Sequence, residues 1–182
     1  MKIKKTIKKT FNFFGYEIKK KDKEINELSF DEILKKKILK SNPLIIDVGA
    51  NNGQSIDRFS DLFNKPVIHS FEPIIKEYNE LKKKFIKSKD VFLNNYALGD
   101  KKEKKYFNIS VKTENSSFNK INLGTNWIKK RSAEFKVKEN EYVKQRQEVN
   151  IDTLDNYCNE RNIDHIDILK IDTQGYEDKV LK

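Results

Sequence analysis

The chain has 182 residues, of which 36% are apolar and 36% are charged, and it carries a formal net charge of +10. This length fits one domain. The apolar runs are about five residues long, too short to cross a bilayer. The single cysteine, Cys158, excludes an intrachain disulfide and a zinc site made of several cysteines.

The positive charge is concentrated near the N-terminus. Residues 1–40 contain 13 lysines and 6 acidic residues, whereas the other 142 residues contain 25 basic and 22 acidic ones. Lysine outnumbers arginine 34 to 4, although the bidentate arginine side chain is better suited to reading base edges. The charge pattern therefore disfavours nucleic acid as a partner.

Residues 1–40 are predicted to form a basic helical extension that precedes a domain at residues 41–182. Two interpretations of this extension remain open: peripheral contact with an anionic membrane surface, or packing on its own domain. No secretory signal pattern is present, so we expect a cytoplasmic protein, with the inner membrane surface as a second location. Apolar residues recur in the extension at helical spacing, at Ile3, Ile7, Phe11, Phe14 and Ile18.

A second helix is predicted at the end of this extension. Ser29 and Glu32 have the spacing of a helix capping box. The segment that follows is predicted to turn three apolar side chains inward, those of Ile33, Leu34 and Ile38.

From Pro43 onward, short apolar runs alternate with segments of helical periodicity. Strands are predicted at residues 44–48, 67–71 and 91–93, with a helix from about Ser55 and another that has Pro73 in its first turn. This order indicates an α/β fold with a doubly wound, mostly parallel sheet. The helices are predicted to bury Ile56, Phe59, Leu62 and Phe63 in the first, and Ile74, Tyr78, Leu81 and Phe85 in the second.

The alternation stops for about fifty residues after the third strand. Residues 106–111 and 135–151 are predicted to be antiparallel strands, because apolar and polar residues alternate there. The polar loop between them contains Trp127, which either stacks on a sugar or anchors the loop. A short helix with Leu154, Tyr157 and Cys158 follows, and then a fourth core strand that ends at Asp172.

Polar motifs follow each predicted core strand. They are DVGANNGQS at 47–55, Glu72, NNYALGD at 94–100 and DTQGYE at 172–177. The carboxyl ends of parallel strands line one crevice, where ligands bind in this class of fold. We therefore expect these four motifs to form one site.

The glycine motif favours a nucleoside-containing cofactor that has no pyrophosphate. Gly49 and Gly53 allow a tight turn, but the motif lacks the lysine of a P-loop and the third glycine of a dinucleotide fingerprint. Glu72 lies 25 residues after Asp47, where a carboxylate can accept both ribose hydroxyls. S-adenosylmethionine has this character.

Together with SFEP at 70–73, NSSF at 115–118 and VNIDTLD at 149–155, these motifs resemble the FkbM-type S-adenosylmethionine-dependent methyltransferases in order and spacing. The resemblance covers residues 43–182. It implies a Rossmann-like class I methyltransferase fold and methyl transfer to a hydroxyl of a sugar, a glycan or a related metabolite. The cofactor-binding residues that it implies are Asp47, Gly49, Ala50, Asn51 and Gly53 on the methionine side, Glu72 at the ribose, and Asn95, Tyr96 and Ala97 beside the adenine.

The resemblance also places Asp172, Gln174, Gly175 and Glu177 near the reacting methyl group and the acceptor. A hydroxyl acceptor must lose its proton, so Asp172 and Glu177 are the candidate catalytic residues, either one as general base. Asp172 could instead cap the helix that follows it. No metal ligand set is assigned, and His69 and His165 are interpreted as structural.

Three alternatives to this enzyme are carried forward: a non-catalytic cofactor-binding module, an RNA methyltransferase and an NAD-dependent reductase. A class I methyltransferase fold typically continues past its fourth strand, whereas this sequence stops at Lys182, so we expect a fold truncated after that strand. Its open sheet edge could be covered by a partner or by a second copy. The chain could then be a non-catalytic cofactor-binding module. An RNA methyltransferase and an NAD-dependent reductase are disfavoured, because IDTQGYE replaces the Pro-Pro motif of the former and the glycine pattern of the latter is missing.

Overall fold

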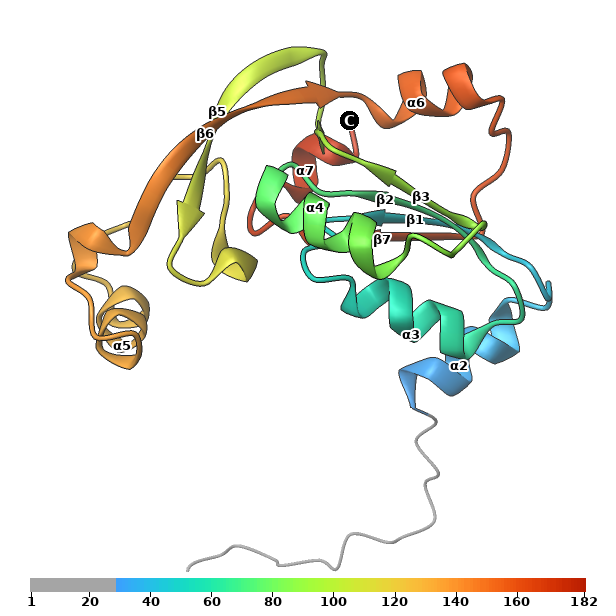
Figure 1. The fold of residues 1–182 in the computed structure, drawn as a ribbon, viewed down its shortest axis with the longest axis horizontal. Helices are drawn as coiled ribbons and strands as arrows, with labels where there is room; N and C mark the ends of the chain where they lie inside the picture. The colour runs from blue at the N-terminus through green and yellow to red at the C-terminus, as the bar shows by residue number, and fades with distance from the viewer. Residues whose placement is uncertain (1–28) are drawn as a thin grey trace, which may run out of the picture. The chain divides into compact units, whose positions relative to one another are not determined.

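The computed structural model describes residues 29–182, and its central feature is a parallel sheet (Figure 1). The sheet contains β1 (Leu44–Val48), β2 (Val67–Phe71), β3 (Val91–Asn94) and β7 (Ile168–Ile171). Their order is β3-β2-β1-β7, and every neighbouring pair is parallel. The prediction of a mostly parallel α/β sheet is confirmed. The predicted bounds of the first two strands are the observed ones.

The helices show why the sheet is doubly wound. The chain passes from β1 to β3 through α3 (Gln54–Leu62) and α4 (Ile75–Lys84), and it reaches β7 on the other side of β1 after α6 (Leu154–Arg161). Figure 1 shows α3 and α6 on opposite faces of the sheet. The strand order therefore reverses between β1 and β7, which is where this kind of fold opens a crevice.

Each face of the sheet has its own apolar contacts. On one face, Ile46, Val48 and Phe71 form a buried cluster with Tyr157 of α6 and with Val180 of α7 (Glu177–Val180). In α3 the buried positions are Ile56 and Phe59, as the helical spacing predicts. The first turn of α4 begins at Ile75, two residues later than expected, because Pro73 precedes the cap residue Ile74.

A second sheet carries a long antiparallel ribbon. It consists of β4 (Ala97–Leu98), β6 (Val143–Asp152) and β5 (Glu103–Ser110) in that order. The antiparallel pairing runs from Glu103 opposite Ile151 to Ser110 opposite Val143. The segment between β5 and β6 contains η1 (Thr113–Asn115), α5 (Asn126–Glu134) and η2 (Glu139–Glu141).

Two predictions for this segment are wrong. Residues 114–131 are not one polar loop, because Thr125 caps α5 by accepting a hydrogen bond from the Ile128 N–H, and Ile128 is fully buried. The second antiparallel strand does not begin at Phe135, which ends α5, but at Val143. Phe135 and Val137, directly after α5, alternate with lysines in the way that strand residues do.

The helix near the start of the described chain, α2 (Phe30–Lys37), has the predicted capping box. The Ser29 N–H donates to Glu32 Oε2 at 2.7 Å, and the Glu32 N–H donates to Ser29 Oγ at 3.3 Å. The expectation that Ile33, Leu34 and Ile38 face inward is wrong for Ile33, which is 42% exposed, and α2 buries none of its residues. Five of its eight residues are charged. The amphipathic pattern predicted for residues 3–18 lies outside the described residues.

His69 belongs to a buried polar network in the central sheet. Its Nδ1 lies 2.6 Å from Tyr157 Oη, which also accepts a hydrogen bond from Asn94 Nδ2 at 3.3 Å. Burial, with Arg161 adding positive charge, lowers the pKa of His69 to about 4. The imidazole is therefore neutral at physiological pH and shares a hydrogen bond with the Tyr157 hydroxyl, which fits a structural role.

Gly49 allows the end of β1 to approach the end of β7. Its φ is +85°, and a Cβ there would collide with the backbone carbonyl oxygen of Asp172. The adjacent backbone is fixed, because the Asp172 N–H donates to the Val48 carbonyl at 2.9 Å and the Gly49 N–H donates to the Phe71 carbonyl at 3.0 Å. Only glycine fits this position without moving the strands apart.

Replacing Gly49 by alanine should separate the cost of this collision from the cost of a left-handed backbone. Gly124 is a matched control, because its φ is +80° and a Cβ there would meet nothing within 4 Å. We expect Gly124→Ala to cost about 1 kcal/mol of unfolding free energy from backbone strain alone, and Gly49→Ala to cost at least about 2 kcal/mol more. Urea unfolding measures both values. Equal losses would contradict close packing between Gly49 and Asp172.

Candidate functional site

A cavity of about 450 Å³ lies at the carboxyl ends of the parallel strands. Its walls come from the loops after β1, β2 and β7, and from β4, β5, η1 and α5. It therefore sits at the point where the strand order reverses. Of the eleven residues predicted for catalysis or cofactor binding, six line it: Gly49, Ala50, Asn51, Glu72, Ala97 and Asp172. Gln174, expected near the acceptor, lines it as well.

Five other predicted site residues are not in the cavity lining. Gly53 begins α3, and a Cβ there would meet the side chains of Phe85 and Leu81 at 2.7 and 2.8 Å. Two others lie behind the wall after β3. The Nδ2 of Asn95 donates to the Glu72 carbonyl at 2.9 Å, and the Tyr96 ring packs edge-on against Phe71 at 5.4 Å. The remaining two, Asp47 and Glu177, are described below with their partners.

Glu72 is a buried carboxylate at the end of β2, and only 4% of it is exposed. Its Oε2 accepts a hydrogen bond from the Asn51 N–H at 2.8 Å, and its Oε1 accepts one from the Ile74 N–H at 2.8 Å. Burial raises the pKa of Glu72 to about 7, although both backbone N–H groups favour the ionised form. Each oxygen keeps a lone pair for a further donor.

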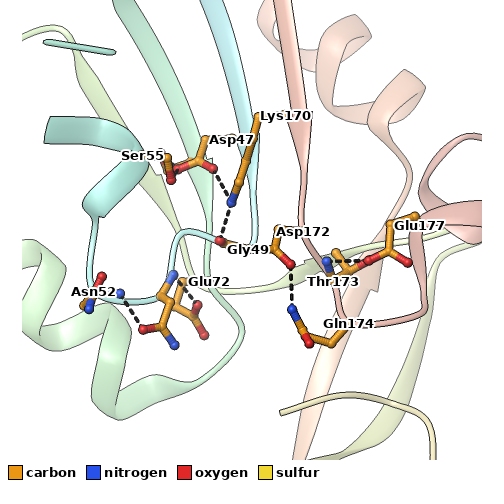
Figure 2. A network of polar contacts seen from close by, with 12 residues as sticks. Asp47, Gly49, Asn52, Ser55, Glu72, Lys170, Asp172, Thr173, Gln174 and Glu177 are labelled. Atoms are coloured by element: carbon orange, nitrogen blue, oxygen red, sulfur yellow. Dashed lines mark hydrogen bonds and ion pairs between the residues drawn. The ribbon is translucent and has the colours of Figure 1, made fainter. Parts of the chain in front are cut away.

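Asp47 is fully buried in β1 and is balanced by Lys170 of β7 (Figure 2). Lys170 Nζ lies 3.0 Å from Asp47 Oδ1 in an ion pair and donates to the Gly49 carbonyl at 2.8 Å. Asp47 Oδ2 accepts a hydrogen bond from Ser55 Oγ at 2.9 Å, which ties the start of α3 to β1. The lysine thus joins the two strands that border the crevice.

Lys170 lines the cavity but was not among the residues expected in the site. The apolar pattern of HIDILKID predicts a core strand and assigns no role to its lysine. The available signal is the lysine itself, because a charge inside an apolar parallel strand needs a partner of opposite charge. The partner is 123 residues earlier in the chain, so only the fold identifies it.

The loop after β7 holds the two candidate bases in different environments. Asp172 lines the cavity, and its Oδ1 accepts a hydrogen bond from Gln174 Nε2 at 2.7 Å. Asp172 does not cap α7, whose cap residue is Tyr176. Figure 2 shows both acids with their hydrogen-bond partners.

Glu177 holds the backbone of this loop. Its carboxylate accepts hydrogen bonds from the Thr173 N–H at 2.8 Å and from the Gly175 N–H at 2.9 Å. Burial alone would raise the pKa of Glu177, but these backbone donors outweigh it and the pKa is lowered. Glu177 is therefore an ionised side chain that positions the loop carrying Asp172.

Aromatic residues form the cavity wall on the side of the ribbon. Phe107 and Phe118 meet edge-to-face at 4.8 Å, and Phe118 lies 4.5 Å from the ring of Tyr176. Trp127 does not line this cavity; its ring packs against Tyr142 at 5.8 Å. Of the two interpretations left open for the tryptophan, the structure favours the anchor.

Charged side chains at the mouth of the cavity have opposite charges nearby. Lys112 pairs with Glu114 at 2.7 Å, and Arg131 pairs with Glu134 at 2.9 Å.

Within residues 29–182, no group of three or more His, Cys, Asp or Glu side chains is placed to hold a metal ion. In the same part of the chain, no helix is long and apolar enough to span a membrane.

The raised pKa of Glu72 predicts a specific dependence of stability on pH. In the folded state Glu72 keeps its proton up to about pH 7, whereas the ordinary pKa of a glutamate side chain is 4.5. Its contribution to stability is therefore complete below pH 4.5 and is lost as the pH rises through 7. Relative to Glu72→Gln, the wild type should lose about 3 kcal/mol of unfolding free energy over this range. A difference that stays constant with pH would contradict the raised pKa.

Residues 47–182 match the family model described as the methyltransferase FkbM domain. The match covers about three quarters of the chain and includes every strand of both sheets except the first three residues of β1. No curated protein matches the chain. The cavity at the switch point and the family match agree, and the chain belongs to the FkbM methyltransferase family.

Proposed function

We propose that the protein uses S-adenosylmethionine to methylate a hydroxyl of a sugar, a glycan or a related metabolite. The observation that carries this proposal is Glu72, a buried carboxylate that faces the cavity with an unused lone pair on each oxygen. Vicinal ribose hydroxyls are a matching pair of donors.

The residues around Glu72 fit the remaining parts of this cofactor. Gly49, Ala50 and Asn51 bring the backbone close to the cavity, which suits the polar methionine end. Ala97 offers a small apolar surface for the adenine, and Asn95 and Tyr96 support the wall behind it. When bound, the cofactor supplies a methyl group activated by a sulfonium.

The acceptor is proposed to lie between Asp172 and the aromatic wall. Phe107 and Phe118 provide the apolar surface that the face of a sugar ring requires. Asp172 is the proposed general base that takes the hydroxyl proton, with its orientation fixed by Gln174. Glu177 acts through the loop and not on the substrate, so it is a positioning residue. Because methyl transfer is an in-line displacement, this positioning supplies much of the catalysis.

A second candidate function is a cofactor-binding module without turnover. It is supported by β7, which pairs with β1 alone among the described strands and whose four residues are all half-buried. A partner protein or a second copy of the chain could cover this edge. Binding and turnover must therefore be measured separately.

Calorimetric titration tests the cofactor. We expect S-adenosylmethionine to bind and NAD not to bind, and Glu72→Ala to weaken S-adenosylmethionine on the order of 100-fold, because two hydrogen bonds to a carboxylate are lost. Glu80→Ala is the control, since Glu80 is exposed and outside the cavity lining. Binding of NAD, or tight binding of S-adenosylmethionine that is indifferent to Glu72, would contradict the assignment.

Transfer of a labelled methyl group to a panel of sugars and glycans tests the two acids. Asp172→Asn should lower kcat by about 10²- to 10⁴-fold and leave the affinity for S-adenosylmethionine nearly unchanged. Glu177→Gln should mainly lower Tm, because it weakens the hydrogen bonds that hold the loop. Equal kcat for Asp172→Asn and the wild type would exclude Asp172 as the base. Binding without turnover in the wild type would favour the module.

A further inference from the structure

The end of α4 and the loop that joins it to β3 are strongly basic and expose a large aliphatic side chain. Lys82–Lys89 contains five lysines and no acidic residue. In its middle, Ile86 is 79% exposed, between the half-buried Phe85 and the exposed Lys87. An aliphatic side chain is therefore presented to the outside between lysines on both sides.

An open groove lies beside this segment. Its volume is about 760 Å³, and its apolar lining includes Phe85, Ile86, Val91 and Leu93. Its charged lining consists of Lys76, Lys82 and Lys83, with Glu80 as the acidic residue. The groove therefore combines an apolar lining with positive charge, and β3, which contributes Val91 and Leu93, is an edge strand of the central sheet.

The lysines of the segment differ in how far they are already paired. Lys84 bonds to Asp57 and to the Asn52 carbonyl, and Lys83 pairs with Glu80 at 2.7 Å. Within residues 29–182, Lys87 and Lys89 form no ion pair, and both are exposed. Their charge is available to an external anion.

The part of the segment next to β3 lies away from the cavity, whereas Lys84 reaches the Asn52 carbonyl in the cavity wall. The former part precedes β3, and the Ile68 N–H at the start of β2 bonds to the Asp90 carbonyl at 2.8 Å, which places it at the amino ends of the strands. The cavity is at their carboxyl ends.

We propose that Lys82–Lys89 docks the protein on an anionic phospholipid surface, with Ile86 inserted among the lipids and Lys87 and Lys89 at the headgroups. Clustered lysines around an exposed aliphatic residue are the features that such surfaces bind. Residues 1–40 add a second basic, apolar-spaced segment in the sequence. Two such segments in one chain suit an extended anionic surface better than one acidic peptide.

Cosedimentation of the full chain with vesicles tests the docking surface. The vesicles contain phosphatidylcholine alone or phosphatidylcholine mixed with phosphatidylserine. We expect binding to the mixed vesicles only, and Lys87→Glu with Lys89→Glu should weaken it at least about tenfold. Ile86→Ser should weaken it several-fold with no change in charge.

The matched control is Lys129→Glu with Lys130→Glu on α5, which changes the net charge equally at two exposed positions. This control should change vesicle affinity less than about threefold. Equal losses in both double variants would show a response to net charge alone and would overturn the proposal. Full retention of vesicle binding in the Lys87 and Lys89 double variant would also overturn the proposal, because binding would then belong to another part of the chain. Binding of the protein to polyglutamate but not to vesicles would overturn it as well. Circular dichroism establishes that each variant is folded.

Discussion

The joint between β1 and β7 determines the geometry of the whole site. A fully buried carboxylate such as Asp47 is unfavourable without a partner, and Lys170 supplies the opposite charge from the neighbouring strand. The same ammonium group holds the Gly49 carbonyl, and Gly49 in turn lies against the backbone of Asp172. The methionine side and the acceptor side of the proposed site are therefore held in a fixed relative position by the Lys170 ammonium group and by the absence of a side chain at Gly49.

Two buried groups in β2 and directly after it pull the pH dependence of stability in opposite directions. Burial lowers the pKa of His69 to about 4, so its contribution to stability is lost as the pH falls from 6.5 toward 4. Burial raises the pKa of Glu72 to about 7, so its contribution is lost as the pH rises from 4.5 through 7. Between pH 4.5 and 6.5, the contributions of His69 and Glu72 to the unfolding free energy change with pH in opposite directions. A flat pH profile of the wild type is thus compatible with two strongly shifted groups.

The sequence predicts the central sheet well because its signals are local. The LIIDV and VIHSF runs are mostly apolar and end at polar motifs, and their bounds are those of β1 and β2. The parts that could not be predicted depend on distant partners. Ala97 and Leu98 form a strand only because they pair with Ile151 and Asp152. The aromatic wall likewise forms only when Phe118 is brought against Tyr176.

The end of the β5–β6 pairing brings the two ends of the intervening segment, residues 111–142, together in a narrow neck. Ser110 pairs with Val143, and the Val111 N–H donates to the Tyr142 carbonyl at 2.8 Å, so the two ends of residues 111–142 are adjacent in space. A segment whose ends meet can be lengthened, shortened or exchanged with little effect on the register of the strands that carry it. Residues 111–142 can therefore be exchanged as a unit, so that the lining they give to the cavity can change while the strands around it stay in place.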